Sequence, residues 1–231
     1  IRFMNKQATY NWQMNAAGLA AVWAKDNTRA EIFNALSRRE VYATTGPRIS
    51  LRFFGGYDFH QDDLDPESLV ANGYEKGIPM GGELNAKKDA PPSFLFAAMK
   101  DPRGANLDRL QIVKGWVENE EMKEKVFNVA WSDERPVDEE GNITAVGNTV
   151  NLEEATWTDT IGNAALLGIW SDPEHDPSKA AVYYARVLQI PTPRWTLYDK
   201  VRFGIKDMDE EIPLVTQERA YSSPIWYKPK K

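Results

Sequence analysis

The chain has 231 residues, of which 42% are hydrophobic and 27% are charged, a balance typical of a globular protein with a packed core. Its formal net charge of −6 argues against a general binder of nucleic acids or of anionic membranes. The sequence contains no Cys and only two His, which excludes disulfides, thiolate metal sites, cysteine nucleophiles and a complete His-rich metal centre built by this chain alone. No apolar run approaches the roughly 18 residues of a membrane span.

The first residues, Ile1 to Met4, show neither an initiator Met nor the charged-then-apolar layout of a signal peptide. We therefore expect a piece of a longer polypeptide. A chain without Cys is compatible with both the cytosol and the periplasm. The compartment stays open, with the periplasm or another exported location as the working hypothesis.

The first predicted element is a helix that begins at Thr28. Thr28 and Glu31 have the spacing of a capping box in front of an apolar set. A strand over residues 41–44 follows and ends at the turn formed by residues 45–47. The apolar run 18–23, before the helix, is compatible with a buried strand or with a loop.

Residues 1–48 are predicted to form one α/β unit that is too small to bury its own faces. We expect its apolar side chains to pack against the following domain or against a second copy of the chain, so a homo-oligomer is one possible assembly. Left exposed together, these side chains would form an apolar patch that is unusual on a soluble monomer. They are Trp12, Trp23, Ile32, Phe33 and Leu36.

Beyond Arg48 the sequence changes to short strands separated by turns rich in Gly and Pro, which is the pattern of an antiparallel β-sandwich. The predicted strands cover residues 49–53, 93–100, 108–117, 123–131, 164–170, 180–189 and 224–228. The third and fourth of these are expected to form a hairpin. The polar stretches 57–92 and 133–163 are predicted as long loops.

A late helix is predicted to be capped by Thr196 and to end at Gly204. The predicted fold is mainly β with some α. It consists of a short α/β unit over residues 1–48 and an antiparallel β-sandwich-like domain over residues 49–231.

Several segments resemble a known family. Residues 18–23, 27–29 and 39–48 are similar to the closing segment of a PHP-like domain (polymerase and histidinol phosphatase), which implies that residues 1–48 are the remnant of a PHP-like barrel. Five later segments look like the C-terminal half of the PHP-like family catalogued as domain of unknown function 3604. These segments are 107–116 (LDRLQIVKGW), 172–177 (DPEHDP), 183–188 (YYARVL), 191–195 (PTPRW) and 217–226 (QERAYSSPIW).

The resemblance implies the C-terminal part of a metal-dependent hydrolase, with phosphoesters as the expected substrates. Enzymes of this type hold their metal ions with His-x-His and Asp-x-His motifs, which in this family lie upstream of the segment at hand. We therefore expect no cofactor in this chain, a divalent metal in an N-terminal half outside it, and that half as its main partner. Nucleic acids and membranes are not expected partners, and the 231 residues alone are expected to be inactive.

Thr45 and Arg48 are candidate substrate-binding residues because they follow the strand 41–44. The resemblance makes this the last strand of the barrel, and active sites of α/β barrels gather at the C-terminal ends of the strands. The alternative is a tight connection between two domains, which the intervening Gly46 and Pro47 also favour.

Arg194 is the third candidate, because Pro191 and Pro193 stiffen the segment before it. A guanidinium held in this way suits an anionic substrate. The alternative is a structural segment in which Arg194 pairs with a neighbouring carboxylate. In either case we expect the side chain of Trp195 to be largely buried in the core.

Two polar clusters have a superficial likeness to metal sites. The acidic loop 58–65 offers carboxylates that suit Ca²⁺, but its spacing is not that of an EF-hand, so a solvated loop is preferred. The segment 172–176 carries His175 at a position where the resemblance implies an aromatic residue, so His175 is interpreted as a turn residue. No metal ligand is assigned in this chain.

The alternative function is a non-catalytic, aromatic-rich β-sandwich that binds a carbohydrate or a protein. The eight Trp residues are compatible with both functions. An exposed flat row of aromatic side chains favours binding, whereas their burial favours a structural role. A third possibility, a self-contained hydrolase with two facing carboxylates, is left open by the 34 acidic residues.

Overall fold

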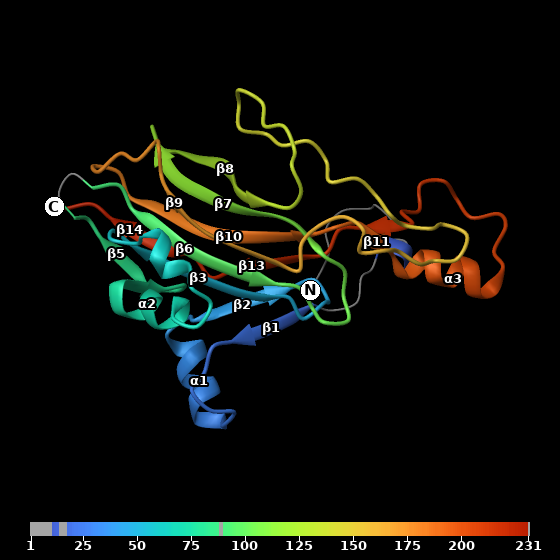
Figure 1. The fold of residues 1–231 in the computed structure, drawn as a ribbon, viewed down its shortest axis with the longest axis horizontal. Coiled ribbons are helices and arrows are strands. Elements are labelled where there is room, and N and C mark those ends of the chain that lie inside the picture. Colours follow the sequence, from blue (N-terminus) through green and yellow to red (C-terminus); the bar gives the residue numbers. More distant parts are fainter. Residues whose placement is uncertain (1–10, 14–17, 88–89, 231) are drawn as a thin grey trace.

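The computed structural model describes residues 11–13, 18–87 and 90–230 and shows two packed β-sheets (Figure 1). The larger sheet has eight strands, which are β1 (Leu19–Val22), β2 (Val41–Thr44), β5 (Glu83–Asn85), β7 (Leu107–Glu118), β8 (Glu121–Trp131), β10 (Ala181–Gln189), β13 (Arg219–Ser222) and β14 (Ile225–Lys228). The smaller sheet has the order β4 (Gly77–Pro79), β3 (Ser50–Gly56), β6 (Ser93–Met99), β9 (Ala165–Ser171). A further pair joins β11 (Thr192–Pro193) to β12 (Val215–Thr216). The predicted mainly β, antiparallel sandwich-like fold is confirmed.

Strand β10 organises the larger sheet. Along one side it pairs with β7 over its whole length, and along the other side its first half pairs with β14 and its second half with β13. β7 continues into β8 through the predicted hairpin, whose turn consists of Asn119 and Glu120. Both turn residues have positive φ, at 51° and 64°, as a type I′ hairpin turn requires.

The main core lies between the two sheets, where inward-facing side chains from both of them meet. Phe53 and Phe94 stack in the smaller sheet with ring centroids 5.3 Å apart, and Phe94 also contacts Tyr183 of β10 at 4.6 Å. All three are essentially fully buried. Burial of large aromatic side chains stabilises a fold by about 2–3 kcal/mol each, so these rings make a large contribution to the sandwich.

A second apolar cluster lies on the outer face of the smaller sheet, where it is covered by α2 (Leu69–Lys76). Leu95 of β6 and Phe54 of β3 contact Leu69 and Phe59 there. Strand β6 is therefore buried on both faces, which explains its continuous apolar sequence. Because α2, β4 and β5 lie within residues 57–92, the prediction of a long loop for that stretch is wrong.

Two other helices were expected and are present, one of them with a different start. Helix α1 (Arg29–Ser37) begins where predicted, since the Thr28 side chain accepts a hydrogen bond from the Glu31 N–H at 3.3 Å. Helix α3 (Trp195–Phe203) ends at Gly204 as predicted, but its N-cap is Arg194 and not Thr196. Thr196 lies in the first turn, and its hydroxyl donates to the Pro213 carbonyl.

The N-terminal segment joins the larger sheet instead of standing apart from it. Strand β2 pairs antiparallel with β1 on one side and with β13 on the other, so its assignment to a barrel rests on the resemblance alone. The division of the chain at residue 48 stays a prediction. Residues 133–163 contain no helix or multi-residue strand, as expected for a long loop.

The apolar side chains of the first 48 residues have different environments within this chain. Trp23 is half-buried against the core and donates from Nε1 to the Leu51 carbonyl at 2.9 Å. Phe33 and Leu36 of α1 remain 67% and 51% exposed, so they do not make the expected contact with the sandwich. Figure 1 shows α1 projecting away from the sheets. No helix in the described part of the chain is long and apolar enough to cross a membrane.

Candidate functional site

An open pocket lies where the end of β2 meets the start of α3 and the strands β12 and β13. It brings together two of the three predicted substrate-binding residues, Thr45 and Arg194, which are far apart in the sequence. The remaining lining residues are Gly18, Thr44, Gly46, Pro193, Trp195, Tyr198, Val215, Thr216, Gln217, Glu218, Arg219 and Tyr221. We call this hollow the α3 pocket.

Thr45 connects β2 to β13 through its backbone and its side chain. Its N–H donates to the Arg219 carbonyl at 3.0 Å, and its hydroxyl accepts from the Arg219 N–H at 2.9 Å. The same hydroxyl donates to the Glu218 carboxylate. Thr45 therefore fixes the position of a carboxylate and of an Arg backbone on the wall of the pocket.

Arg194 and Trp195 have the opposite exposures from those expected. The Arg194 side chain is only 8% exposed and its Nη2 donates to the Trp12 carbonyl at 2.8 Å, whereas Trp195 is 40% exposed. The guanidinium carbon of Arg194 lies 5.4 Å from the Trp195 ring centroid. The prediction that Trp195 is largely buried is wrong. Arg194 instead ties the backbone of Trp12 to the start of α3.

Arg48 lies outside the α3 pocket. Its side chain is exposed, and its backbone N–H donates to Oδ2 of Asp101 at 2.7 Å. This bond and a second one from the Arg103 N–H lower the pKa of the Asp101 carboxyl. The structural contribution of Arg48 thus comes from its backbone, which anchors the connection between β2 and β3.

The sequence patterns do not reveal Arg219, Tyr221 or Tyr198 as site residues. Arg219 and Tyr221 are two residues apart on β13 and so project from the same face of the sheet. The only available signal was their place in the segment 217–226, because the partner strands of β13 are not visible in a single sequence. Tyr198 could be recognised as a site residue only with the correct start of α3.

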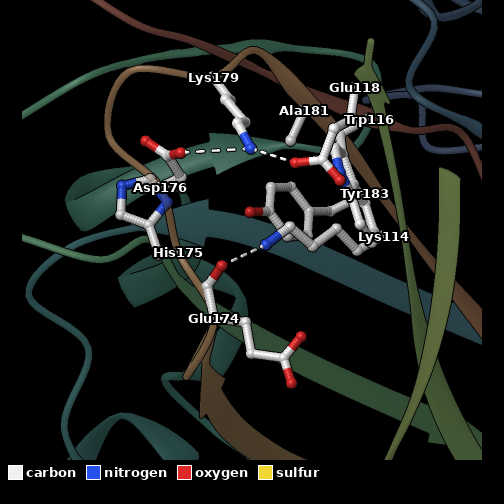
Figure 2. Close-up of a pocket in the computed structure, with 9 residues that line it drawn as sticks. All are labelled: Lys114, Trp116, Glu118, Glu174, His175, Asp176, Lys179, Ala181 and Tyr183. Carbon is white, nitrogen blue, oxygen red and sulfur yellow. Dashed lines mark hydrogen bonds and ion pairs between the residues drawn. The ribbon is translucent and has the colours of Figure 1, made fainter. Parts of the chain in front are cut away.

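A second, smaller pocket of about 130 Å³ lies beside β7 and β10 (Figure 2). At its base the ammonium of Lys114 pairs with Asp172 Oδ2 at 2.6 Å and donates to the Glu174 carbonyl at 2.8 Å. The Tyr183 hydroxyl donates to the same carboxylate oxygen at 2.7 Å. Lys114, Asp172 and Tyr183 are all less than 10% exposed, and burial together with this bond raises the pKa of Tyr183.

His175 lines one side of this smaller pocket. Its ring packs edge-on against Tyr227 with the centroids 4.7 Å apart. Its Nε2 is buried and makes no hydrogen bond within the described part of the chain. Burial lowers the pKa of His175, and the nearby Lys114 ammonium acts in the same direction, whereas Asp172 opposes both.

Two of the four carboxylates of the acidic loop 58–65 are engaged by lysines. Asp58 pairs with Lys87 at 2.7 Å, and Asp63 pairs with Lys76 at 2.6 Å while accepting from the His60 N–H at 2.9 Å. The Asp-x-His spacing does occur once in the chain, at Asp58 and His60. Within residues 11–13, 18–87 and 90–230, no three His, Asp or Glu residues are grouped so that they could hold a metal ion.

Comparison with known proteins identifies one family. The sequence model of the family described as "Protein of unknown function (DUF3604)" matches residues 1–229. No curated protein and no solved structure matches the chain.

Proposed function

The chain belongs to the DUF3604 family, and from this premise we propose that it is the C-terminal part of a PHP-like, metal-dependent hydrolase that acts on phosphoesters. The carrying observation is the α3 pocket, in which Thr45 and Arg194 lie together with Arg219. Arg219 supplies a guanidinium, a group that suits a phosphate ester, and the Thr45 hydroxyl holds the backbone of Arg219 in place.

In this proposal the metal ions belong to a part of the protein outside this chain. Bound there, a divalent metal would polarise the phosphoryl oxygen and activate a water molecule. The described residues do not form a site that fits such an ion. The chain's own residues bind and orient the substrate. Arg219 faces the anionic group, Thr45 holds Glu218 in place, and Arg194 fixes the backbone of Trp12.

The test begins with the intact mass of the gene product, compared with the 26.2 kDa of this chain. A larger product, purified with divalent metal, should hydrolyse p-nitrophenyl phosphate, and a chelator should abolish the activity. The 231-residue chain alone should show no turnover. Absence of metal-dependent phosphoesterase activity in the longer product would overturn the proposal.

A matched pair of variants tests the α3 pocket in that product. Arg219→Gln removes the guanidinium from the pocket wall and should raise KM about tenfold, since one charge-assisted contact contributes about 1.5 kcal/mol. Arg29→Gln, an exposed residue of α1, should leave KM unchanged. Equal KM values for both variants would remove the α3 pocket from the proposed active site.

A second function is favoured by the exposed aromatic side chains of α3. Trp195 and Tyr198 are 40% and 45% exposed and lie three residues apart on the rim of the pocket, so they share one helix face. This arrangement suits stacking against a sugar ring and supports the carbohydrate-binding alternative. Quenching of Trp fluorescence by a soluble oligosaccharide, lost in Trp195→Ala, would favour binding over hydrolysis.

A further inference from the structure

The outer face of the larger sheet carries three arginines on neighbouring strands. The register places Arg109 of β7 and Arg219 of β13 on either side of Leu188 of β10. Arg186 lies two residues before Leu188 and therefore projects from the same face. The alternate residues of these strands, among them Leu110, Val187 and Ala220, are buried in the core on the other face.

Among the described residues, two of these guanidinium groups have only neutral hydrogen-bond partners. Arg186 donates from Nε to the Gln111 amide oxygen at 2.8 Å, and Arg219 donates from Nη1 to the Tyr221 hydroxyl at 3.4 Å. Neither forms an ion pair with any carboxylate of the described residues. Each therefore keeps N–H donors that can bind another acceptor.

A single carboxylate, that of Asp108, forms the ion pairs of this cluster. Asp108 is fully buried and pairs with Arg109, with Arg135 at 2.8 Å and with the Gln217 amide at 2.9 Å. Arg135 is itself buried, and it also donates to the Thr144 carbonyl at 2.9 Å. Of the four guanidinium groups at this end of the sheet, those of Arg109 and Arg135 thus pair with Asp108, and those of Arg186 and Arg219 pair with no carboxylate of the described residues.

This concentration of like charge is unfavourable in the unliganded protein. Burial lowers the pKa of Arg109, and the charges of Arg135, Arg186 and Arg219 lower it further, against the opposite effect of Asp108. A carboxylate from the protein would ordinarily balance such a cluster. On the solvent side of this cluster, Arg219 is exposed and Arg186 is partly exposed.

We propose that the outer face of the larger sheet binds a small oxyanion, a phosphate or sulfate group, between the guanidinium groups of Arg109, Arg186 and Arg219. Planar guanidinium groups with free parallel N–H donors match the oxygen edges of such groups. The Tyr221 hydroxyl lies beside Arg219 and offers a further donor. The inference shares Arg219 with the proposed hydrolase but goes beyond it, because binding on this face involves Arg109 and Arg186 and requires neither catalysis nor a metal.

The face is continuous with the α3 pocket, since Arg219 and Tyr221 line both. A free oxyanion would occupy the arginine face alone. An oxyanion carried as a monoester would place its organic group toward the α3 pocket. The two sources share the same chemistry at the arginines, and they differ in what the pocket contributes to affinity.

The test uses calorimetric titration of the 231-residue chain with sodium phosphate and sodium sulfate at constant ionic strength, with chloride as the reference anion. Saturable binding of phosphate or sulfate is expected, with a loss of affinity of at least tenfold in Arg186→Gln. Arg29→Gln, the matched surface substitution, should bind as the unchanged chain does. No saturable binding, or equal binding in Arg186→Gln, would overturn the inference.

Two further measurements separate binding from a structural role. Because Arg186→Gln removes one like charge, its melting temperature in chloride buffer should be unchanged or raised. Phosphate should raise the melting temperature of the unchanged chain but not that of Arg186→Gln. A lower melting temperature in chloride together with an undiminished phosphate effect would contradict the proposal. Phenyl phosphate identifies the source: binding tighter than inorganic phosphate indicates a monoester, and equal binding indicates the free ion.

Discussion

The side chains beneath the smaller pocket show how one buried charge depends on another. Replacing Asp172 with Ala would leave the Lys114 ammonium buried without its carboxylate and would remove the acceptor of the Tyr183 hydroxyl. We expect the free energy of unfolding to fall by about 3–5 kcal/mol, measured by urea denaturation. Glu83→Ala breaks the exposed pair with Lys228 and should cost at most about 1 kcal/mol.

His175 gives this region a pH dependence whose sign follows from its lowered pKa. Because the unfolded chain binds the proton more tightly, stability is unaffected above the unfolded pKa of about 6.5 and falls as the pH drops below it. His175→Phe should keep the edge-on contact with Tyr227 and lose this dependence. Thermal melts at pH 8 and pH 5.5 should therefore show a smaller difference for His175→Phe than for the unchanged chain, and equal differences would contradict this account.

The reversed exposures of Arg194 and Trp195 have a simple geometric cause. The sequence offered Thr196 as an attractive N-cap, and the true cap is two residues earlier. A cap at Thr196 would leave Trp195 in front of the helix, whereas the true cap makes Trp195 the first helical residue, and successive helical residues point about 100° apart. Thr196 and Leu197 are the residues buried in this first turn, and Trp195 faces outward. Local preference identified the helix, whereas packing decided its rotation.

At the scale of elements, the β7–β8 hairpin shows a turn whose second residue is a poor fit. Glu120 adopts φ 64°, a left-handed conformation that favours Gly. Glu120→Gly should stabilise the protein by about 0.5–1 kcal/mol, measured as a higher urea midpoint with an unchanged m-value. Glu121→Gly, the neighbouring substitution inside β8, should destabilise it by a similar amount.

Helix α2 depends on close approach to the smaller sheet. A Cβ on Gly73 would lie 2.6 Å from the Phe54 ring, too close for the helix to keep its position. Although Ala is the better helix former by about 1 kcal/mol, Gly73→Ala should lower the unfolding free energy by about 1–3 kcal/mol. Glu75→Ala on the exposed side of α2 should leave it unchanged. A more stable Gly73→Ala variant would show that the helix can shift.

The same helix explains why the sequence patterns did not predict the elements within residues 57–92. An eight-residue helix with Gly73 in its middle has little helical preference of its own, and its buried face is completed by Phe54 and Leu95 from distant strands. The strands β6, β7, β8 and β10 were predictable because their apolar and β-branched residues form long local patterns. Of the candidate site, Thr45 was selected because it follows the strand 41–44, which the resemblance makes the last of a barrel, and Arg194 was selected from its Pro neighbours. Arg219 needed the pairing of β13 with its neighbours.

For the whole molecule, the long loop 133–163 is an insertion between strands of different sheets. Endoproteinase Glu-C should cut it at the exposed Glu139, Glu140, Glu153 or Glu154, because irregular exposed segments are the preferred sites of nicking. The two fragments should remain associated, since β9 and β10 pair with β6 and β7 from the other side of the cut. We expect two bands on a denaturing gel, whereas under native conditions the cut protein should keep the mass of the uncut chain. Separation of the fragments would show that the sheets do not hold the halves together.

The pairing of β2 with β13 has a consequence for the order in which the protein can assemble. The bond from the Arg219 N–H to the Thr45 hydroxyl joins residues 174 positions apart. At a ribosomal rate of about 5–20 residues per second, β2 waits roughly 10–35 s for its partner strand to be synthesised. During that interval the β1–β2 ribbon exposes an unpaired edge to neighbouring nascent chains. Translation speed and chaperone supply should therefore govern the yield of soluble protein more strongly than the stability of the finished sandwich.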